Sequence, residues 1–116
     1  MEIKKGDILI ANLKGIPIGS EQGGQRPVVV IQNNTGNRFS PTLIVASVTS
    51  KLNKTNIPTH VEIEDYEACG LEVPSVILLE QVRTIDKRRI KKKINKTENK
   101  ELIEKIDKAL RISFDL

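Results

Sequence analysis

A polar, glycine-rich stretch early in the chain combines residue types that could bind an anion. In GSEQGGQRPVVV, residues 19–30, one arginine stands directly before an apolar run. The glycines let the backbone approach a ligand, and Pro27 biases Arg26 toward an extended conformation that directs its guanidinium away from the loop. A guanidinium is a planar fork of donors that suits phosphate oxygens and keeps its charge at cellular pH. Arg26 is therefore a candidate phosphate ligand, with pairing to Glu21 or capping of loop carbonyls as the structural alternative.

Other catalytic patterns are missing from the sequence. It contains no GxxxxGK[ST] phosphate loop, no GxGxxG after a strand and no HExxH, and it has one histidine, His60. The single cysteine, Cys69, cannot form an internal disulfide, which favours a reducing cytoplasm. A metal site would need carboxylates alone, and the acidic residues 62–67 have the pattern of a turn between strands. We therefore expect neither a metal nor a cofactor.

Short β-strands dominate the expected structure. The β-branched run PVVVIQ predicts a central strand covered on both faces, with Pro27 as its first residue. Asn, Gly and Pro in residues 33–42 predict a turn that joins this strand to the next as a hairpin. The predicted strands are residues 6–12, 27–32, 43–49, 59–63 and 75–82.

The spacing of apolar residues changes from that of strands to that of a helix only in the tail. Residues 96–113 predict a helix capped by Thr97 or Asn95. The positions that share one apolar stripe are Leu102, Ile103, Ile106, Ala109 and Leu110, and the expected one-turn ion pairs are Glu101/Lys105 and Glu104/Lys108. Runs of short strands closed by one helix favour a mainly β fold, a small partly open barrel of about five to seven strands. At 116 residues, we expect one domain over residues 1–116.

Positive charge is concentrated in one part of the chain. Nineteen Lys and Arg against fifteen Asp and Glu give a net charge of +4, and the segment 83–96 holds eight of these cations against one acid. Its core, residues 87–93, is called the basic run below. It is either a phosphate-attracting surface or a solvated connector. The apolar run at residues 8–11 is too short for a signal sequence or a membrane span, so we expect a cytoplasmic protein without membrane contact.

Several stretches, in this order and spacing, resemble the MazF/PemK family of type II toxins. They are GDILIANL, GSEQGGQRPVVVIQN, IVASVTS, PTHVEI and VILLEQVRTID, and the resemblance runs from Gly6 to the terminal helix. It implies an SH3-like, CcdB-like barrel and a homodimeric endoribonuclease that cuts single-stranded RNA. It also implies a cognate MazE-like antitoxin that occludes the RNA groove.

The resemblance also implies the roles of individual residues. The family's catalytic arginine and threonine fall on Arg26 and Thr49. The implied substrate-binding residues are Ser20, Gln22, Ser50, Lys51, Glu80 and Gln81. Cleavage in this family needs no metal, because the ribose 2′-hydroxyl attacks the adjacent phosphate and leaves a 2′,3′-cyclic phosphate and a 5′-hydroxyl. Glu21 is our candidate general base, since arginine is not deprotonated in proteins. We expect a structural role for His60.

Two other function classes remain as alternatives. A non-enzymatic toxin resembling CcdB would bind DNA gyrase through its C-terminal helix, but that family's tail carries a tryptophan and this chain has none. A passive RNA-binding module would use the basic run to hold phosphates. With one Tyr and two Phe, the sequence lacks the set of base-stacking aromatics that single-strand binders usually carry.

Overall fold

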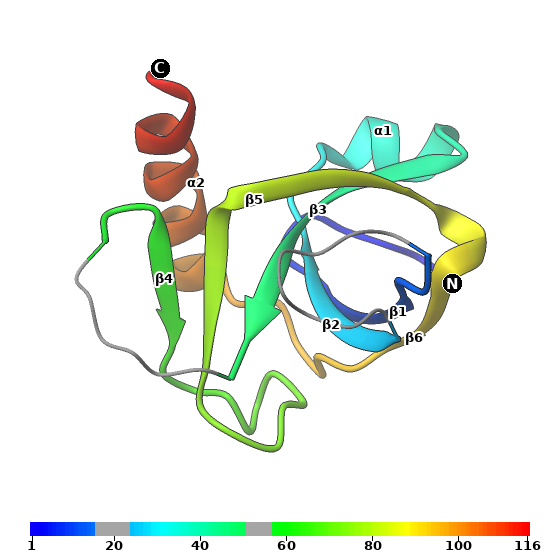
Figure 1. The fold of residues 1–116 in the computed structure, drawn as a ribbon, viewed down its shortest axis with the longest axis horizontal. Coiled ribbons are helices and arrows are strands. Elements are labelled where there is room, and N and C mark those ends of the chain that lie inside the picture. Colours follow the sequence, from blue (N-terminus) through cyan, green and yellow to red (C-terminus); the bar gives the residue numbers. More distant parts are fainter. Residues whose placement is uncertain (16–23, 51–56) are drawn as a thin grey trace.

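The protein is built around one antiparallel β-sheet (Figure 1). A computed structural model describes residues 1–15, 24–50 and 57–116. In this described part, six strands follow the order β4-β5-β3-β2-β1-β6. Their bounds are β1 Ile8–Asn12, β2 Gln25–Val30, β3 Thr42–Thr49, β4 His60–Ile63, β5 Ser75–Asp86 and β6 Ile90–Lys93. The prediction of a mainly β fold of five to seven strands with a C-terminal helix is confirmed.

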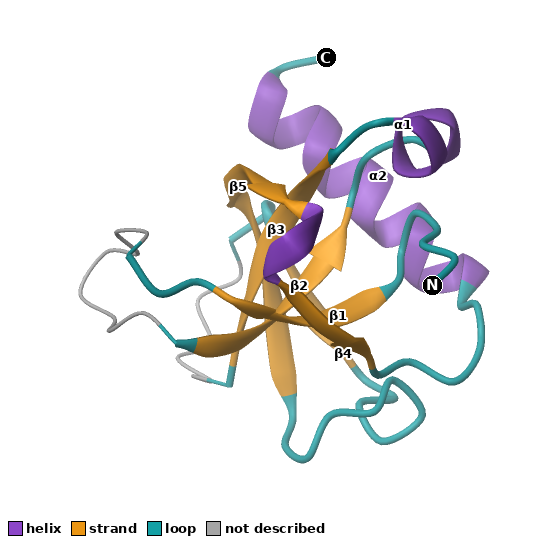
Figure 2. Ribbon diagram, turned by 90° about the vertical axis from the view of Figure 1, so that its right-hand side faces the viewer, coloured by secondary structure: helices purple, strands orange, loops and turns teal. Residues whose placement is uncertain are grey.

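Three helical segments accompany the sheet: α1 Asn34–Phe39, the 3₁₀ turn η1 Lys87–Arg89 and α2 Lys100–Phe114. Figure 2 shows α1 beside the upper right of the sheet and α2 running behind it. Leu102, Ile106 and Ala109 of α2 are buried, as the predicted stripe requires, and Lys105 pairs with Glu101 at 3.6 Å. No helix in the described ranges is both long and apolar enough to span a membrane.

The curled sheet has an apolar core on each face, because neighbouring residues of a strand point to opposite sides. On one side, Val29 of β2 joins Ala46, Val48 and the buried side chains of α2. On the other, Val28 and Val30 join Leu9, Leu43 and Val45. Since Val28, Val29 and Val30 are all fully buried, the prediction of a strand covered on both faces is confirmed.

Two details of β2 and its connection differ from the sequence-based expectation. Pro27 lies inside β2 and not at its start, at a position where the strand pairs with β1 but not with β3. A residue without an N–H is tolerated where one side of the strand has no partner. The connection to β3 contains α1, because the Asn33 side chain accepts from the N–H of Gly36 and caps a short helix that ends before Pro41.

The start of α2 is also capped differently. Asn99, not Thr97 or Asn95, accepts from the N–H of Leu102 at 3.0 Å. Asn95 serves the sheet instead, since it accepts from the N–H of Ile8 and donates to the carboxylate of Asp7. Three residues separate a helix N-cap from the N–H it satisfies, and in the folded chain only Asn99 has that position.

One long strand, β5, pairs with two different partners and bends between them. Ser75–Leu78 pairs with β4, while the pairing with β3 shifts from Ser47↔Leu78 to Ala46↔Val82. Residues 79–81 therefore have no partner in β3. Extra residues in one strand form a bulge that bends the sheet and redirects side chains. The bulge includes Glu80 and Gln81, two of the predicted substrate-binding residues.

Candidate functional site

Arg26 and Thr49 lie at adjacent ends of neighbouring strands. β2 and β3 pair through Val28↔Ser47, Val29↔Ala46 and Val30↔Val45. This register, continued by two residues, sets Arg26 against Thr49 on the same face of the sheet. Both side chains are half-buried. On its other side Arg26 pairs with Ala11 of β1, so its backbone is held within the sheet.

Two further polar residues, which sequence analysis missed, share that face. Ser47 lies between Val45 and Thr49 in the alternation of β3, and Arg83 of β5 is paired with Val45. The hydroxyl of Ser47 is buried and has no hydrogen-bond partner among the described residues. The signal was present in the sequence: the face of β3 that begins with Leu43 and Val45 turns polar at Ser47 and Thr49. We call Arg26, Ser47, Thr49 and Arg83 the strand-end cluster.

The strand-end cluster offers charge and hydrogen bonding to a ligand. Two guanidiniums and two hydroxyls lie on one face of a curled sheet, with Arg26 and Thr49 at adjacent strand ends and Arg83 level with Val45. Such donors suit an anion with several oxygens, such as a phosphate group. Strands fix the backbone at all four positions, so the donors need little reorganisation when a ligand arrives. Within the described ranges, no three His, Cys, Asp or Glu side chains come close enough together to hold a metal ion.

Glu80 on the bulge of β5 has two hydrogen-bond donors. His60 Nε2 lies 2.8 Å from one carboxylate oxygen, and the Thr59 hydroxyl donates to the other at 3.2 Å. Partial burial by itself raises the pKa of Glu80. The hydrogen bonds from His60, from the Glu80 backbone and from Thr59, together with the charge of His60, outweigh this effect of burial. They hold the pKa of Glu80 below its ordinary value. His60 thus orients Glu80, and Gln81 beside it is exposed.

Four predicted site residues lie outside the described residues. These are Ser20, Glu21 and Gln22 in the segment 16–23, and Lys51 in the segment 51–56. Ser50 is described, and it is exposed directly after Thr49. The described stem of the first segment is well anchored. The N–H of Leu13 donates to the carbonyl of Gly24 at 2.8 Å, and Arg89 donates to the carbonyls of Asn12 and Lys14 at 3.1 and 3.0 Å.

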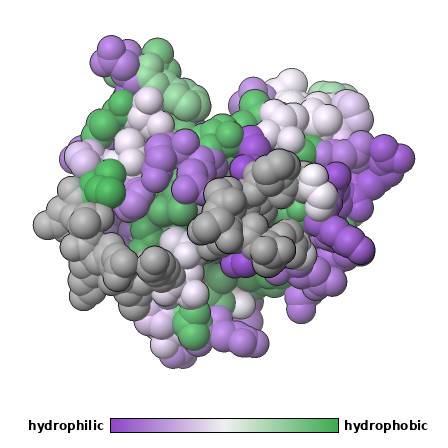
Figure 3. Space-filling model, in the orientation of Figure 1, coloured by the Kyte–Doolittle hydropathy of each residue, from purple (hydrophilic) through white to green (hydrophobic). Residues whose placement is uncertain are grey.

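The basic run is not a simple connector, because it forms η1 and the edge strand β6. Several of its side chains make contacts within the fold. Lys93 pairs at 3.2 Å with the carboxylate of Asp7, which is only 3% exposed, and Lys87 donates to the carbonyl of Asn37. Arg88 pairs with Asp86, and Arg89 anchors the stem described above. Lys91 and Lys92 are exposed. Figure 3 shows hydrophilic residues gathered on the right-hand side, where Figure 1 places β6 and the turn before it.

Comparison with known proteins identifies the family. The model of the PemK-like, MazF-like toxins of type II toxin-antitoxin systems matches residues 4–114. The chain belongs to this toxin family. It is 54% identical to Endoribonuclease EndoA of Bacillus subtilis (strain 168) over 116 residues, which cover all of this chain and 97% of that protein.

Further relatives agree in sequence and in fold. Over 114 residues the toxin is 54% identical to Endoribonuclease MazF of Staphylococcus epidermidis, which covers 98% of this chain and 92% of that protein. The crystal structure of MazF (Form-I) from Deinococcus radiodurans superposes with a TM-score of 0.78 at 21% identity. It covers 100% of this chain and 99% of that chain. The family resemblance expected from the sequence is confirmed, while the roles of single residues stay predictions.

Proposed function

We propose that this toxin is a sequence-specific endoribonuclease that cuts single-stranded RNA without a metal ion. The observation that carries the proposal is the placement of Arg26 and Thr49 on one face at adjacent strand ends. Full-length similarity at 54% identity to proteins named endoribonucleases supports it. Two guanidiniums and two hydroxyls in the strand-end cluster suit the phosphate of an RNA backbone.

The proposed reaction is an internal transfer at phosphorus. The ribose 2′-oxygen forms a bond to the adjacent phosphorus, the bond from phosphorus to the 5′-oxygen breaks, and the products are a 2′,3′-cyclic phosphate and a 5′-hydroxyl. Because the nucleophile is already tethered beside the phosphate, alignment and charge stabilisation supply most of the catalysis. Arg26 stabilises the charge that develops on the phosphoryl oxygens, Arg83 adds a second cation, and Thr49 donates a hydrogen bond.

Two protons move in this reaction, one from the 2′-hydroxyl and one to the 5′-oxygen. Arg26 is a poor base because its guanidinium does not lose a proton in proteins. We propose Glu21 as the group that accepts the first proton. The proposed substrate contacts are Ser20, Gln22, Ser50, Lys51, Glu80 and Gln81. For Glu80, the hydrogen bonds from His60 and Thr59 support an ionised carboxylate with a fixed direction, which could accept from a base amino group.

The same proposal includes the protein's setting. As a member of a type II toxin family, the chain would be held silent in the cytoplasm by a cognate MazE-like antitoxin that covers the RNA groove. We also propose a homodimer. Three apolar side chains near the end of the chain are exposed: Ile112 by 47%, Phe114 by 53% and Leu116 by 87%. Together they form an apolar surface for a second copy of the chain to cover.

Incubation of the purified protein with single-stranded RNA in EDTA tests the chemistry. We expect cleavage at defined sites, 5′-hydroxyl ends that accept phosphate from a polynucleotide kinase, and no cleavage of the same sequence in a duplex. Activity that disappears on chelation and returns with magnesium would refute the metal-free mechanism. RNA binding without cleavage would favour the passive module, and inhibition of gyrase without cleavage would favour the CcdB-like alternative.

A further inference from the structure

An aromatic ring is held in solvent at the end of α1. Phe39 is 74% exposed, and the guanidinium of Arg38 lies 5.2 Å from the centre of its ring. The opposite side of α1 is fixed, because Asn37 is only 3% exposed and donates to the carbonyl of Gln32 at 2.9 Å. Gln32 in turn donates to the carbonyl of Thr42 at 3.1 Å. These bonds fix the rotation of α1, so Phe39 cannot turn toward the core.

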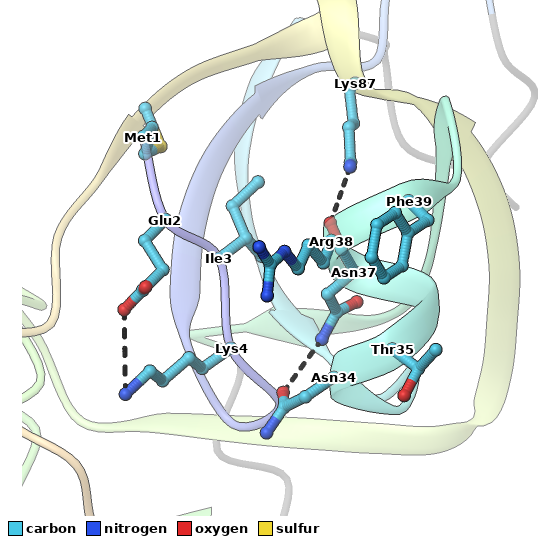
Figure 4. Close-up of a pocket in the computed structure, with 10 residues that line it drawn as sticks. All are labelled: Met1, Glu2, Ile3, Lys4, Asn34, Thr35, Asn37, Arg38, Phe39 and Lys87. Atoms are coloured by element: carbon cyan, nitrogen blue, oxygen red, sulfur yellow. Dashed lines mark hydrogen bonds and ion pairs between the residues drawn. The ribbon is translucent and has the colours of Figure 1, made fainter.

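A cavity of about 630 Å³ opens beside this ring, between α1 and the first residues of the chain (Figure 4). Met1, Glu2, Ile3 and Lys4 form one wall, and Lys87 of η1 reaches in from above to the carbonyl of Asn37. Lys4 is neutralised by Glu2 and Glu98, which lie 3.6 and 3.4 Å away. The excess positive charge of the cavity therefore comes from Arg38 and Lys87.

We propose that Phe39, Arg38 and Lys87 form a second RNA contact, separate from the strand-end cluster. One unpaired base stacks on the ring of Phe39, and a neighbouring phosphate binds Arg38 and Lys87. Exposed aromatic side chains next to cations are the usual contacts for single-stranded nucleic acid, since every base has a flat face and every linkage has a negative charge. This inference rests on RNA being the substrate.

The surroundings favour RNA over an acidic peptide. From Lys87 the basic run leads to Lys91 and Lys92, which are exposed and have no ion-pair partner among the described residues. A series of separated cations suits a regularly charged backbone, and the flat ring of Phe39 suits a base better than it suits an aliphatic side chain.

The second contact lies far from the proposed cleavage site. α1 precedes Thr42, the first residue of β3, whereas Thr49 is its last. Seven steps along a strand span about 23 Å, or about seven stacked nucleotides at 3.4 Å each. A short RNA that binds only at Arg26 and Thr49 would therefore not reach Phe39. A longer RNA would reach both.

The experiment compares two oligonucleotides that contain one mapped cleavage sequence, one just long enough to be cut and one extended by about ten nucleotides on each side. The chain contains no tryptophan, so Phe39→Trp introduces a single fluorescent reporter at the contact. A 2′-deoxy nucleotide at the cleavage position blocks the reaction and allows binding to be measured. We expect the extended RNA to quench the tryptophan emission and the short RNA to leave it unchanged.

Kinetics then separate stacking from general loss of activity. We expect wild type to cut the extended RNA with a kcat/KM on the order of tenfold higher than the short RNA. Phe39→Leu, which keeps an apolar side chain but no flat ring, and Arg38→Gln should remove this preference and leave cleavage of the short RNA unchanged. Lys100→Gln removes one positive charge from α2 and should keep the preference.

Each outcome decides between the claims. If wild type cuts both RNAs equally well, or if Phe39→Leu retains the preference, the second contact is wrong while the endoribonuclease proposal stands. If neither RNA is cut, the proposed function itself fails. A Glu- and Leu-rich peptide serves as the competing ligand. If Phe39→Leu binds RNA as tightly as wild type does but binds this peptide more weakly than wild type does, the cavity is a site for an acidic protein segment and the RNA assignment is overturned.

Discussion

The strand-end cluster and the basic run both carry positive charge, but the fold uses them differently. Arg26 and Arg83 stand on one face of paired strands, where the sheet fixes their backbones. In the basic run, which has more cations, Lys93 neutralises a buried carboxylate and Arg89 donates to the carbonyls of Asn12 and Lys14. The number of charges in a segment is thus a poor guide to function, because the fold decides which charges a ligand can reach.

Loss of Arg26 should have the largest effect on activity. We expect Arg26→Ala to reduce the single-turnover cleavage rate by about 10²–10³, because one fixed charge that stabilises the transition state is removed. Arg26→Lys keeps the charge but not the planar fork and should retain part of the rate. Thermal unfolding of each variant is the control. A rate near wild type, or loss only because the protein unfolds, would make Arg26 a structural residue.

Lys93 should matter for stability and not for cleavage. We expect Lys93→Met to lower the free energy of unfolding by about 1.5 kcal/mol, since the carboxylate of Asp7 stays buried without its cation. The value lies at the low end of the usual range because the Lys93 side chain is 34% exposed and Asp7 keeps two other donors. Urea unfolding measures the change. Lys92→Met is the matched control, and equal effects of the two variants would contradict the structural role of Lys93.

The hydroxyl of Thr49 should contribute less than the charge of Arg26. We expect Thr49→Val, which has a similar shape but no hydroxyl, to slow single-turnover cleavage by about tenfold, the effect of one neutral hydrogen bond. Thr49→Ser restores the hydroxyl and should recover most of the rate. If both variants are equally slow, packing of the Thr49 methyl group and not hydrogen bonding explains the effect.

Lys91 and Lys92 should affect only RNA capture. We expect the double variant Lys91→Gln/Lys92→Gln to leave the cleavage step unchanged. The slope of the logarithm of the binding constant against the logarithm of the salt concentration should become shallower by about 1.4, because each lost phosphate contact lowers it by about 0.7 for single strands. Titration of uncleavable RNA at several salt concentrations gives the slope. Lys100→Gln/Lys108→Gln removes the same charge from α2. An unaltered slope for the first pair would identify the basic run as a solvated surface.

The smallest effect concerns the pairing of His60 with Glu80. We expect His60→Ala to raise the pKa of Glu80 toward its ordinary value, because the strongest hydrogen bond that favours the carboxylate is lost. NMR titration of the Glu80 carboxyl carbon measures the shift. A lowered pKa stabilises the folded state above it, so the stability lost in His60→Ala should shrink as the pH falls through the pKa of Glu80. An unshifted pKa would show that the hydrogen bonds from Thr59 and the backbone are enough to hold the pKa of Glu80 low without His60.

Local patterns in the sequence were enough to predict β1 to β5, the C-terminal helix and the family, whereas β6 in the basic run was not predicted. The fully apolar run of β2 requires burial on both faces, and the spacing of Leu102, Ile106 and Ala109 allows burial only in a helix. Where short-range choices compete, the sequence was ambiguous. Asn and Ser favour turns and helix caps alike, which is why α1 was expected as a turn and why Asn99 was missed as the cap of α2.

Only the tertiary structure decided which distant residues meet. Arg26 and Thr49 are 23 positions apart in sequence, and the register of β2 with β3 brings them to one face. Arg83 joins them because of the shifted pairing of β5, and Lys93 is removed from the set of available charges because Asp7 is buried beside it. A sequence determines which side chains can be buried and with what period, since that depends on neighbours along the chain. Register, bulges and ion pairs depend on neighbours in space, and the fold alone supplies those.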